Sequence, residues 1–130
     1  MMQKYVQEQA ATLLRRLASQ AHEAASLGSA DAVHDLRVAI RRLNQCLRVF
    51  GNFFPRKDVK KIRGELRDVM DVAGAVRNCD IAIELLKKAK LPAEPVLAQE
   101  RRRARKELAG ALTSWSRRDF SQKWRERLIG

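Results

Sequence analysis

Apolar residues recur at three- and four-residue steps along most of the chain, which is the period of an α-helix. The first apolar stripe begins near Tyr5 and comprises Val6, Ala10, Leu13, Leu17, Ala21 and Ala24. The pair Leu27-Gly28 ends this pattern, because glycine readily adopts the left-handed conformation that terminates helices. The sequence therefore predicts a helix from about Tyr5 to Leu27.

A second stripe follows after a short polar link. Its apolar positions are Val33, Leu36, Ile40, Leu43, Leu47 and Phe50. Ser29 or Asp31 can cap the start of this helix with a side-chain oxygen. Gly51 ends it, and the segment GNFFPR turns the chain.

Two more stripes occupy the middle of the chain. One starts near Asp58, which is another plausible cap. The residues that it turns toward the core are Val59, Ile62, Leu66, Val69 and Ala73. We expect a break or kink at Gly74, because glycine is a poor helix former. A further helix is predicted from Asn78 or Asp80 to Lys90, through Ile81, Ile83, Leu85 and Leu86. The segment LPAEP ends it, since proline cannot continue a helix.

The last part of the chain is helical in composition as well. We expect one helix after Pro95, from Val96 to Trp115, and a short helical piece from Asp119 to Ile129. No segment shows the alternation of a strand. The fold class predicted for residues 1–130 is all-α, a single compact antiparallel bundle of four to six helices with a basic face.

Charge is the most unusual feature of the composition. The chain has 27 Lys and Arg against 15 Asp and Glu, a formal net charge of +12. So large an excess costs stability through repulsion and attracts anions such as phosphates, nucleic acids or anionic lipids. An anionic partner is therefore expected.

Other classes of protein find little support in the sequence. Cys46 and Cys79 lie far apart, without a CxxC motif or a histidine at zinc-ligand spacing, so we interpret both as core residues and predict no metal and no cofactor. The N-terminus lacks an apolar signal core, and no apolar run could span a bilayer. We expect a cytoplasmic protein without membrane insertion.

The charge gathers on one side of the second predicted helix. With an advance of about 100° per residue, one face holds His34, Arg37, Arg41, Gln45 and Arg48. Any solvated helix carries charges opposite its apolar stripe, but ordinary surfaces mix both signs, and here Asp35 is the only acid nearby. The uniform sign favours a bound anion. His34 would add a hydrogen-bond donor, although a plain surface role is an alternative, and we interpret His22 as structural.

Two further helices carry basic residues in suitable positions. In the third helix, Lys60, Arg63 and Arg67 lie near Gly64 and Gly74, where the absence of side chains would let a ligand approach. A later run contains Arg101, Arg102, Arg103, Arg105 and Lys106. Arginine forms paired hydrogen bonds with phosphate oxygens. We therefore predict that three helices line one basic surface.

Two segments resemble the markers of a known family, the CHAD domain. The stretch VHDLRVAIRRLNQCLRVF is similar to its signature, a histidine that opens a helix followed by RVxxRRL; the matching residues are His34, Arg37, Val38, Arg41, Arg42 and Leu43. The stretch LRDVMDVAGAVRNCDIAIELL resembles the second marker, G-x-x-R-D-x-D. Gly74, Arg77 and Asp80 fit it, whereas Asn78 stands where aspartate is usual.

The resemblance implies a helical fold that binds inorganic polyphosphate, often at polyphosphate granules or beside phosphate-handling enzymes. Carried over to this sequence, it makes His34, Arg37, Arg41, Arg48 and Arg77 ligand contacts. Arg42 lies at the flank of the basic face, where it contacts either the ligand or a neighbouring helix. The other candidates rest on face geometry and on the generally basic character of the family, without a fixed motif: Lys60, Arg63, Arg67, Arg101, Arg102 and Arg105.

The family domain usually contains two similar helical halves, and this chain resembles one of them. We therefore hypothesise that two chains pair about a twofold axis, which would bring two copies of His34 together and rebuild the channel.

The sequence leaves three alternatives to a polyphosphate-binding protein. An enzyme would need convergent acids, but pairs such as Asp68 with Asp71 or Asp80 with Glu84 also serve as ordinary salt-bridge partners, and no P-loop is present. Nucleic acid would bind any basic surface, yet few aromatic residues are available to stack on bases. We expect a non-enzymatic protein with nucleic acid as a non-specific competitor only, and a role as accessory domain of a phosphate-handling enzyme stays open.

Overall fold

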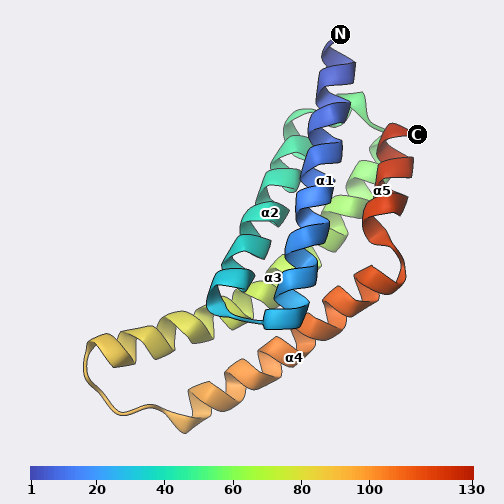
Figure 1. Cartoon of the computed structure of the whole chain (residues 1–130). Coiled ribbons are helices and arrows are strands. Elements are labelled where there is room, and N and C mark those ends of the chain that lie inside the picture. The colour runs from blue at the N-terminus through green and yellow to red at the C-terminus, as the bar shows by residue number, and fades with distance from the viewer.

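The computed structural model describes residues 1–130 and is entirely helical. Its elements are α1 (Met2–Leu27), α2 (Ala30–Val49), the 3₁₀ turn η1 (Gly51–Phe53), α3 (Arg56–Lys88), α4 (Pro95–Arg117) and α5 (Phe120–Ile129) (Figure 1). The predicted all-α bundle is confirmed.

Neighbouring helices in the chain are also neighbours in space. α1 packs on α2, α2 on α3 and α3 on α4, while α4 and α5 return against α1 (Figure 1). α2 and α4 make no contact with each other. The two flanks of α2 therefore face different helices, with α1 along one and α3 along the other.

The ends of α1 and α2 follow the sequence signals closely. Gly28 adopts the left-handed conformation (φ 58°) and donates its backbone N–H to the Ala24 carbonyl at 3.0 Å. The Ser29 hydroxyl then accepts from the Ala32 backbone N–H at 3.2 Å, which caps α2. Of the two candidate caps, Ser29 is thus the one used. In α3 the N-cap position belongs to Pro55, and Asp58 lies in the first turn.

The predicted break at Gly74 is wrong, and so is the separate fourth helix after it. α3 runs unbroken for 33 residues through this position. Val69, Ala73, Val76 and Cys79 are all buried, so the inward stripe continues on both sides of the glycine. A glycine inside a helix costs about 1 kcal/mol relative to alanine. Full burial of a single valine contributes about 1.5 to 3 kcal/mol, so packing outweighs the local preference.

The core is a single cluster that draws on every α-helix. Leu14, rather than the predicted Leu13, is fully buried in α1, and Leu13 packs partly against the core. At the α4–α5 junction Trp115, Phe120 and Trp124 form an aromatic cluster with ring centroids 4.7 to 5.2 Å apart. These rings fix α5 against the end of α4.

Both cysteines are buried and free, as predicted for core residues. Burial raises the pKa of the Cys46 thiol. Burial also raises the pKa of Cys79, with Glu100 and Asp80 acting in the same direction and Arg101 opposing them. Both thiols therefore stay protonated at neutral pH, a form in which cysteine is a poor nucleophile.

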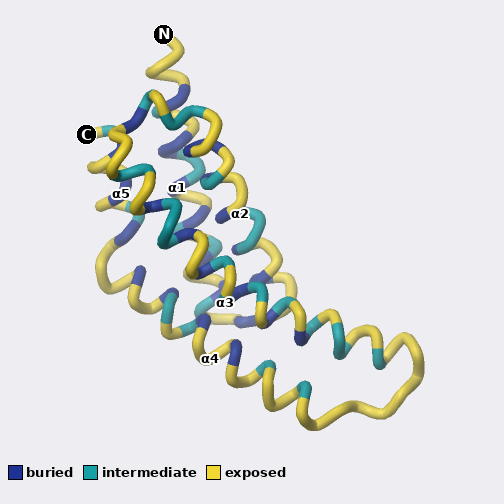
Figure 2. The backbone as a smooth tube through the Cα atoms, turned by 180° about the vertical axis from the view of Figure 1, so that it is seen from behind, coloured by how far each residue is buried: buried dark blue, intermediate teal, exposed yellow.

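The end of α3 and the start of α4 project beyond the rest of the bundle as a helical hairpin (Figures 1 and 2). We call residues 80–100 the arm. None of them is buried. The chain thus consists of a packed body and an arm that contributes nothing to its core.

No helix combines the length and the apolar character that crossing a membrane would require.

Candidate functional site

The basic face predicted on α2 is present in the structure. His34, Arg41, Gln45 and Arg48 are exposed and Arg37 is half-buried. The opposite side of the helix is buried in the core, as Leu36, Ile40, Leu43 and Leu47 show. The clean separation expected from the helical period is therefore confirmed.

α2 and α3 enclose a cleft of about 170 Å³, which we call the α2–α3 groove. It is lined by Ile40, Arg41, Asn44, Arg63, Leu66, Arg67, Met70 and Asp71. Arg41 from α2 is thereby brought together with Arg63 and Arg67 from α3. The groove combines apolar walls with three guanidinium groups.

Arg63 is held in place by a neighbour from the other helix. Its Nε donates to the Asn44 Oδ1 at 2.9 Å across the α2–α3 interface. This single bond fixes the side chain while both terminal nitrogens remain free to donate to a ligand. Asn44 therefore positions a cation without neutralising it.

Arg37 precedes Arg41 by one helical turn and presents an unsatisfied donor. Its Nε is shielded from solvent and has no hydrogen-bond partner in the chain. A buried donor left unpaired costs about 1 to 3 kcal/mol. Because the Nε is shielded from a ligand as well as from water, contact with an anion would use the terminal nitrogens of the guanidinium group.

Basic residues continue along both helices beyond the groove. Because α2 and α3 run antiparallel, Arg48 lies toward the same end as Lys60, and Arg37 toward the same end as Gly74 and Arg77 (Figure 1). Arg77 lies fourteen residues after Arg63, a spacing that returns to the same helix face. A Cβ placed on Gly64 or Gly74 would meet no atom within 4 Å, so the space beside these glycines is open.

The cations of the α2–α3 groove are not neutralised by the chain itself. Its ion pairs are Lys88–Glu84, Arg101–Asp80 and Arg118–Glu65, and none involves a residue of the groove. Asp71 lines the groove but forms no ion pair. Like charges held together in this way attract an anion.

The arginines of α4 do not line the α2–α3 groove, and their predicted contact with a ligand stays a prediction. Arg101 pairs with Asp80 and donates from Nη2 to the Gly28 carbonyl at 3.0 Å. Arg105 donates from Nη2 to the Leu27 carbonyl at 3.0 Å. Both thus satisfy carbonyls at the C-terminal end of α1, where cations are favoured. α4 packs on α3 and not on α2, and neither these residues nor the exposed Arg102 line the groove.

Arg42 lies on the opposite flank of α2, facing α1. A separate cleft of about 260 Å³ is lined there by Leu13, Arg16, Gln20, Asp35, Val38, Ala39 and Arg42. Consecutive residues of a helix point about 100° apart, so Arg41 and Arg42 cannot face the same neighbour. Of the two roles considered for Arg42, the structure supports the one beside a neighbouring helix.

Two groove residues were missed from the sequence. Asn44 lies three residues after Arg41, and Asp71 lies four after Arg67. Residues three or four positions apart lie on the same face of a helix, so Asn44 lies on the face of Arg41 and Asp71 on the face of Arg67. Extending each basic face to its polar residues would have found them.

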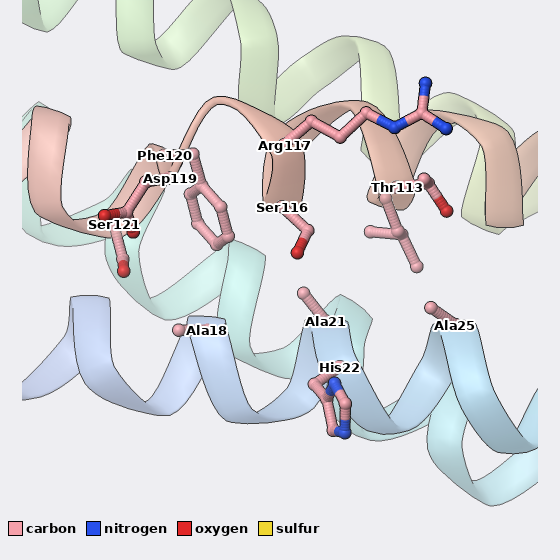
Figure 3. A pocket seen from close by; sticks show the side chains of 11 residues that line it. Ala18, Ala21, His22, Ala25, Thr113, Ser116, Arg117, Asp119, Phe120 and Ser121 are labelled. Atoms are coloured by element: carbon pink, nitrogen blue, oxygen red, sulfur yellow. The ribbon is translucent and has the colours of Figure 1, made fainter.

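A larger cleft of about 380 Å³ lies between α1 and the α4–α5 junction (Figure 3). Its floor is formed by small side chains, Ala18, Ala21 and Ala25, and His22 lies exposed at its edge. None of the predicted site residues lines it. No group of three or more His, Cys, Asp or Glu side chains is placed to hold a metal ion.

Comparison with known proteins gives one match. No curated protein and no solved structure matches the chain. The family model described as the CHAD domain matches residues 8–130, nearly the entire chain. The two sequence markers fall in α2 and α3, the helices that form the groove. The chain therefore belongs to the CHAD domain family.

Proposed function

We propose that this protein binds linear inorganic polyphosphate in the α2–α3 groove without catalysing a reaction on it. The observation that carries the proposal is that Arg41 of α2 meets Arg63 and Arg67 of α3 without an ion pair to any acid. The binding surface continues through His34, Arg37, Arg48, Lys60 and Arg77.

The spacing of the cations suits a repeating anion. Positions four residues apart on a helix are separated by about 6 Å along its axis, so Arg37 and Arg41 would engage successive parts of one phosphate chain. Arg63 and Arg67 would donate to the same chain from the other wall. Each guanidinium can form paired, charge-assisted hydrogen bonds with phosphate oxygens.

Family membership supports the choice of ligand. The CHAD domain is associated with polyphosphate-related proteins. His34, Arg37 and Arg41 match its first marker and Arg77 its second. Hydrolysis with magnesium would require several converging carboxylates, whereas Asp71 is the one acid that lines the groove. These features favour holding the polymer over cleaving it.

Cellular context and assembly form part of the same proposal. We expect the protein to act in the cytoplasm, at polyphosphate granules or beside a phosphate-handling enzyme. Two copies would pair and offer two grooves to one polymer.

Nucleic acid is the main rival ligand because it carries a phosphate backbone as well. Single-strand binders gain about 1 to 3 kcal/mol for each base stacked on an aromatic ring. The lining of the groove includes no aromatic residue. Nucleic acid would therefore bind through its phosphates alone, as a weaker competitor.

A competition experiment tests the proposal. Labelled single-stranded DNA is first bound to the protein, and fluorescence anisotropy then measures its displacement. The competitors are long-chain polyphosphate, unlabelled DNA and polyglutamate, all of matched charge. Polyphosphate should act at the lowest concentration, and all binding should weaken as salt rises. Equal or better displacement by DNA would make the protein a nucleic-acid binder, and equal displacement by polyglutamate would reduce the site to a general polyanion surface.

A further inference from the structure

The arm exposes an unusual concentration of large apolar side chains. Ile81, Leu85, Leu91 and Val96 are 40%, 61%, 57% and 55% exposed. In the body, away from the N-terminus, exposed residues of this kind occur singly. Scattered apolar residues need no explanation, but a group of them on one projecting element marks an interaction surface.

The tip of the arm also has a small apolar cleft. It measures about 120 Å³ and is lined by Ile83, Leu86, Lys87, Leu91, Ala93, Glu94 and Ala98. For comparison, a cavity of about 150 Å³ in another protein accommodates benzene. This cleft therefore has the size to receive one aliphatic side chain.

The arm differs from the body in charge. Residues 80–100 contain four acids and three lysines, so the remainder of the chain holds 24 of the 27 basic residues and 11 of the 15 acidic ones. Both signs are mixed within the arm. Lys87, Lys88 and Lys90 lie at the end of α3 and just beyond it, where Glu84 pairs with Lys88, and Glu94 and Glu100 lie at the start of α4.

We propose that the arm is a self-association surface on which the arm of a second copy of this chain docks. Two bodies of strong positive charge repel each other, and the arm is the one region where two copies can approach without that penalty. An exposed leucine of each arm would enter the cleft of the other. This assigns the surface used for the pairing proposed above, and it does not depend on what the groove binds.

The physical character of this contact gives it a distinctive response to salt. Salt screens the repulsion between the two bodies while leaving apolar burial intact. Self-association through the arm should therefore strengthen as salt rises from low concentration. Polyphosphate binding in the groove should weaken over the same range, so the two events can be separated in one titration.

The test is sedimentation velocity of the full chain over a range of protein concentrations, without polyphosphate. Wild type should dimerise, and the Leu85→Asp/Leu91→Asp variant should show a dissociation constant raised at least tenfold with the same helical circular dichroism. Val49→Asp is the matched control, because Val49 is 57% exposed but lies on α2. It should dimerise like wild type.

The possible outcomes decide the question. A wild type that stays monomeric at every concentration, or a control that loses the dimer as fully as the arm variant, overturns the proposal. A monomeric wild type that binds anionic vesicles, with binding lost in the arm variant, would overturn it in favour of a membrane contact. The arm variant should still bind polyphosphate, and a dimer that binds none would refute the function of the groove while leaving the arm as assigned.

Discussion

The arginines of the α2–α3 groove and those of α4 belong to similar basic runs, yet the fold uses them in opposite ways. Arg101 and Arg105 reach the carbonyl end of α1, and Arg101 also meets Asp80. Arg41 and Arg67 meet other cations and form no ion pair. One set therefore supports the structure, and the other keeps its charge available for a ligand.

The difference comes from what each helix meets. The last turn of a helix leaves carbonyls without a partner, and a cation placed there is stabilising. α4 crosses this end of α1, so its arginines are satisfied within the chain. The facing surfaces of α2 and α3 are regular helix sides with no free carbonyls, and their arginines find no comparable partner.

Removing two groove arginines should have the largest effect on binding. Each hydrogen-bonded charge contributes about 1.5 kcal/mol or more, so Arg37→Ala/Arg41→Ala should weaken polyphosphate binding by about 100-fold. Isothermal titration calorimetry would measure the affinity, and circular dichroism should show unchanged helicity. The matched control is Arg102→Ala/Arg103→Ala, which removes the same charge from exposed positions on α4. A loss of similar size in the control would mean that net charge, rather than the groove, determines affinity.

Removing an α4 arginine should act on stability instead. Arg101→Ala leaves the carboxylate of Asp80, whose side chain is only 11% exposed, without its partner. We expect a loss of about 2 kcal/mol in the free energy of unfolding, measured by urea denaturation, with polyphosphate affinity nearly unchanged. Arg102→Ala, at an exposed position without a partner, should change stability very little. Equal stability of the two variants would show that the contacts of Arg101 do not support the fold.

The sequence predicted what depends on helical period and failed where a partner lies far along the chain. The basic face of α2, the cap at Ser29 and the turn at Gly28 are local features, and all are present. The contact of Arg101 with Gly28 joins residues 73 positions apart. Nothing in the run of arginines from Arg101 indicates it, so the sequence grouped those residues with the arginines of the second and third helices.

Gly74 shows the same limit in a helix. Its local preference favoured a break, yet α3 continues because Ala73 and Val76 are both fully buried beside it. No atom lies where its side chain would be, so packing alone does not require a glycine here. Family markers gave the correct assignment because they record residues that tertiary structure has already selected.

The smallest expected effect concerns His34, which extends the groove surface at the start of α2. Its imidazole would donate a hydrogen bond to a phosphate oxygen. A hydrogen bond at an exposed position contributes about 0.5 kcal/mol, so His34→Ala should weaken polyphosphate binding about two- to threefold. Isothermal titration calorimetry would measure the difference. His22→Ala is the control, because His22 lies on α1 beside a different cleft, and it should bind like wild type. If His34→Ala also binds like wild type, the binding surface ends at Arg37.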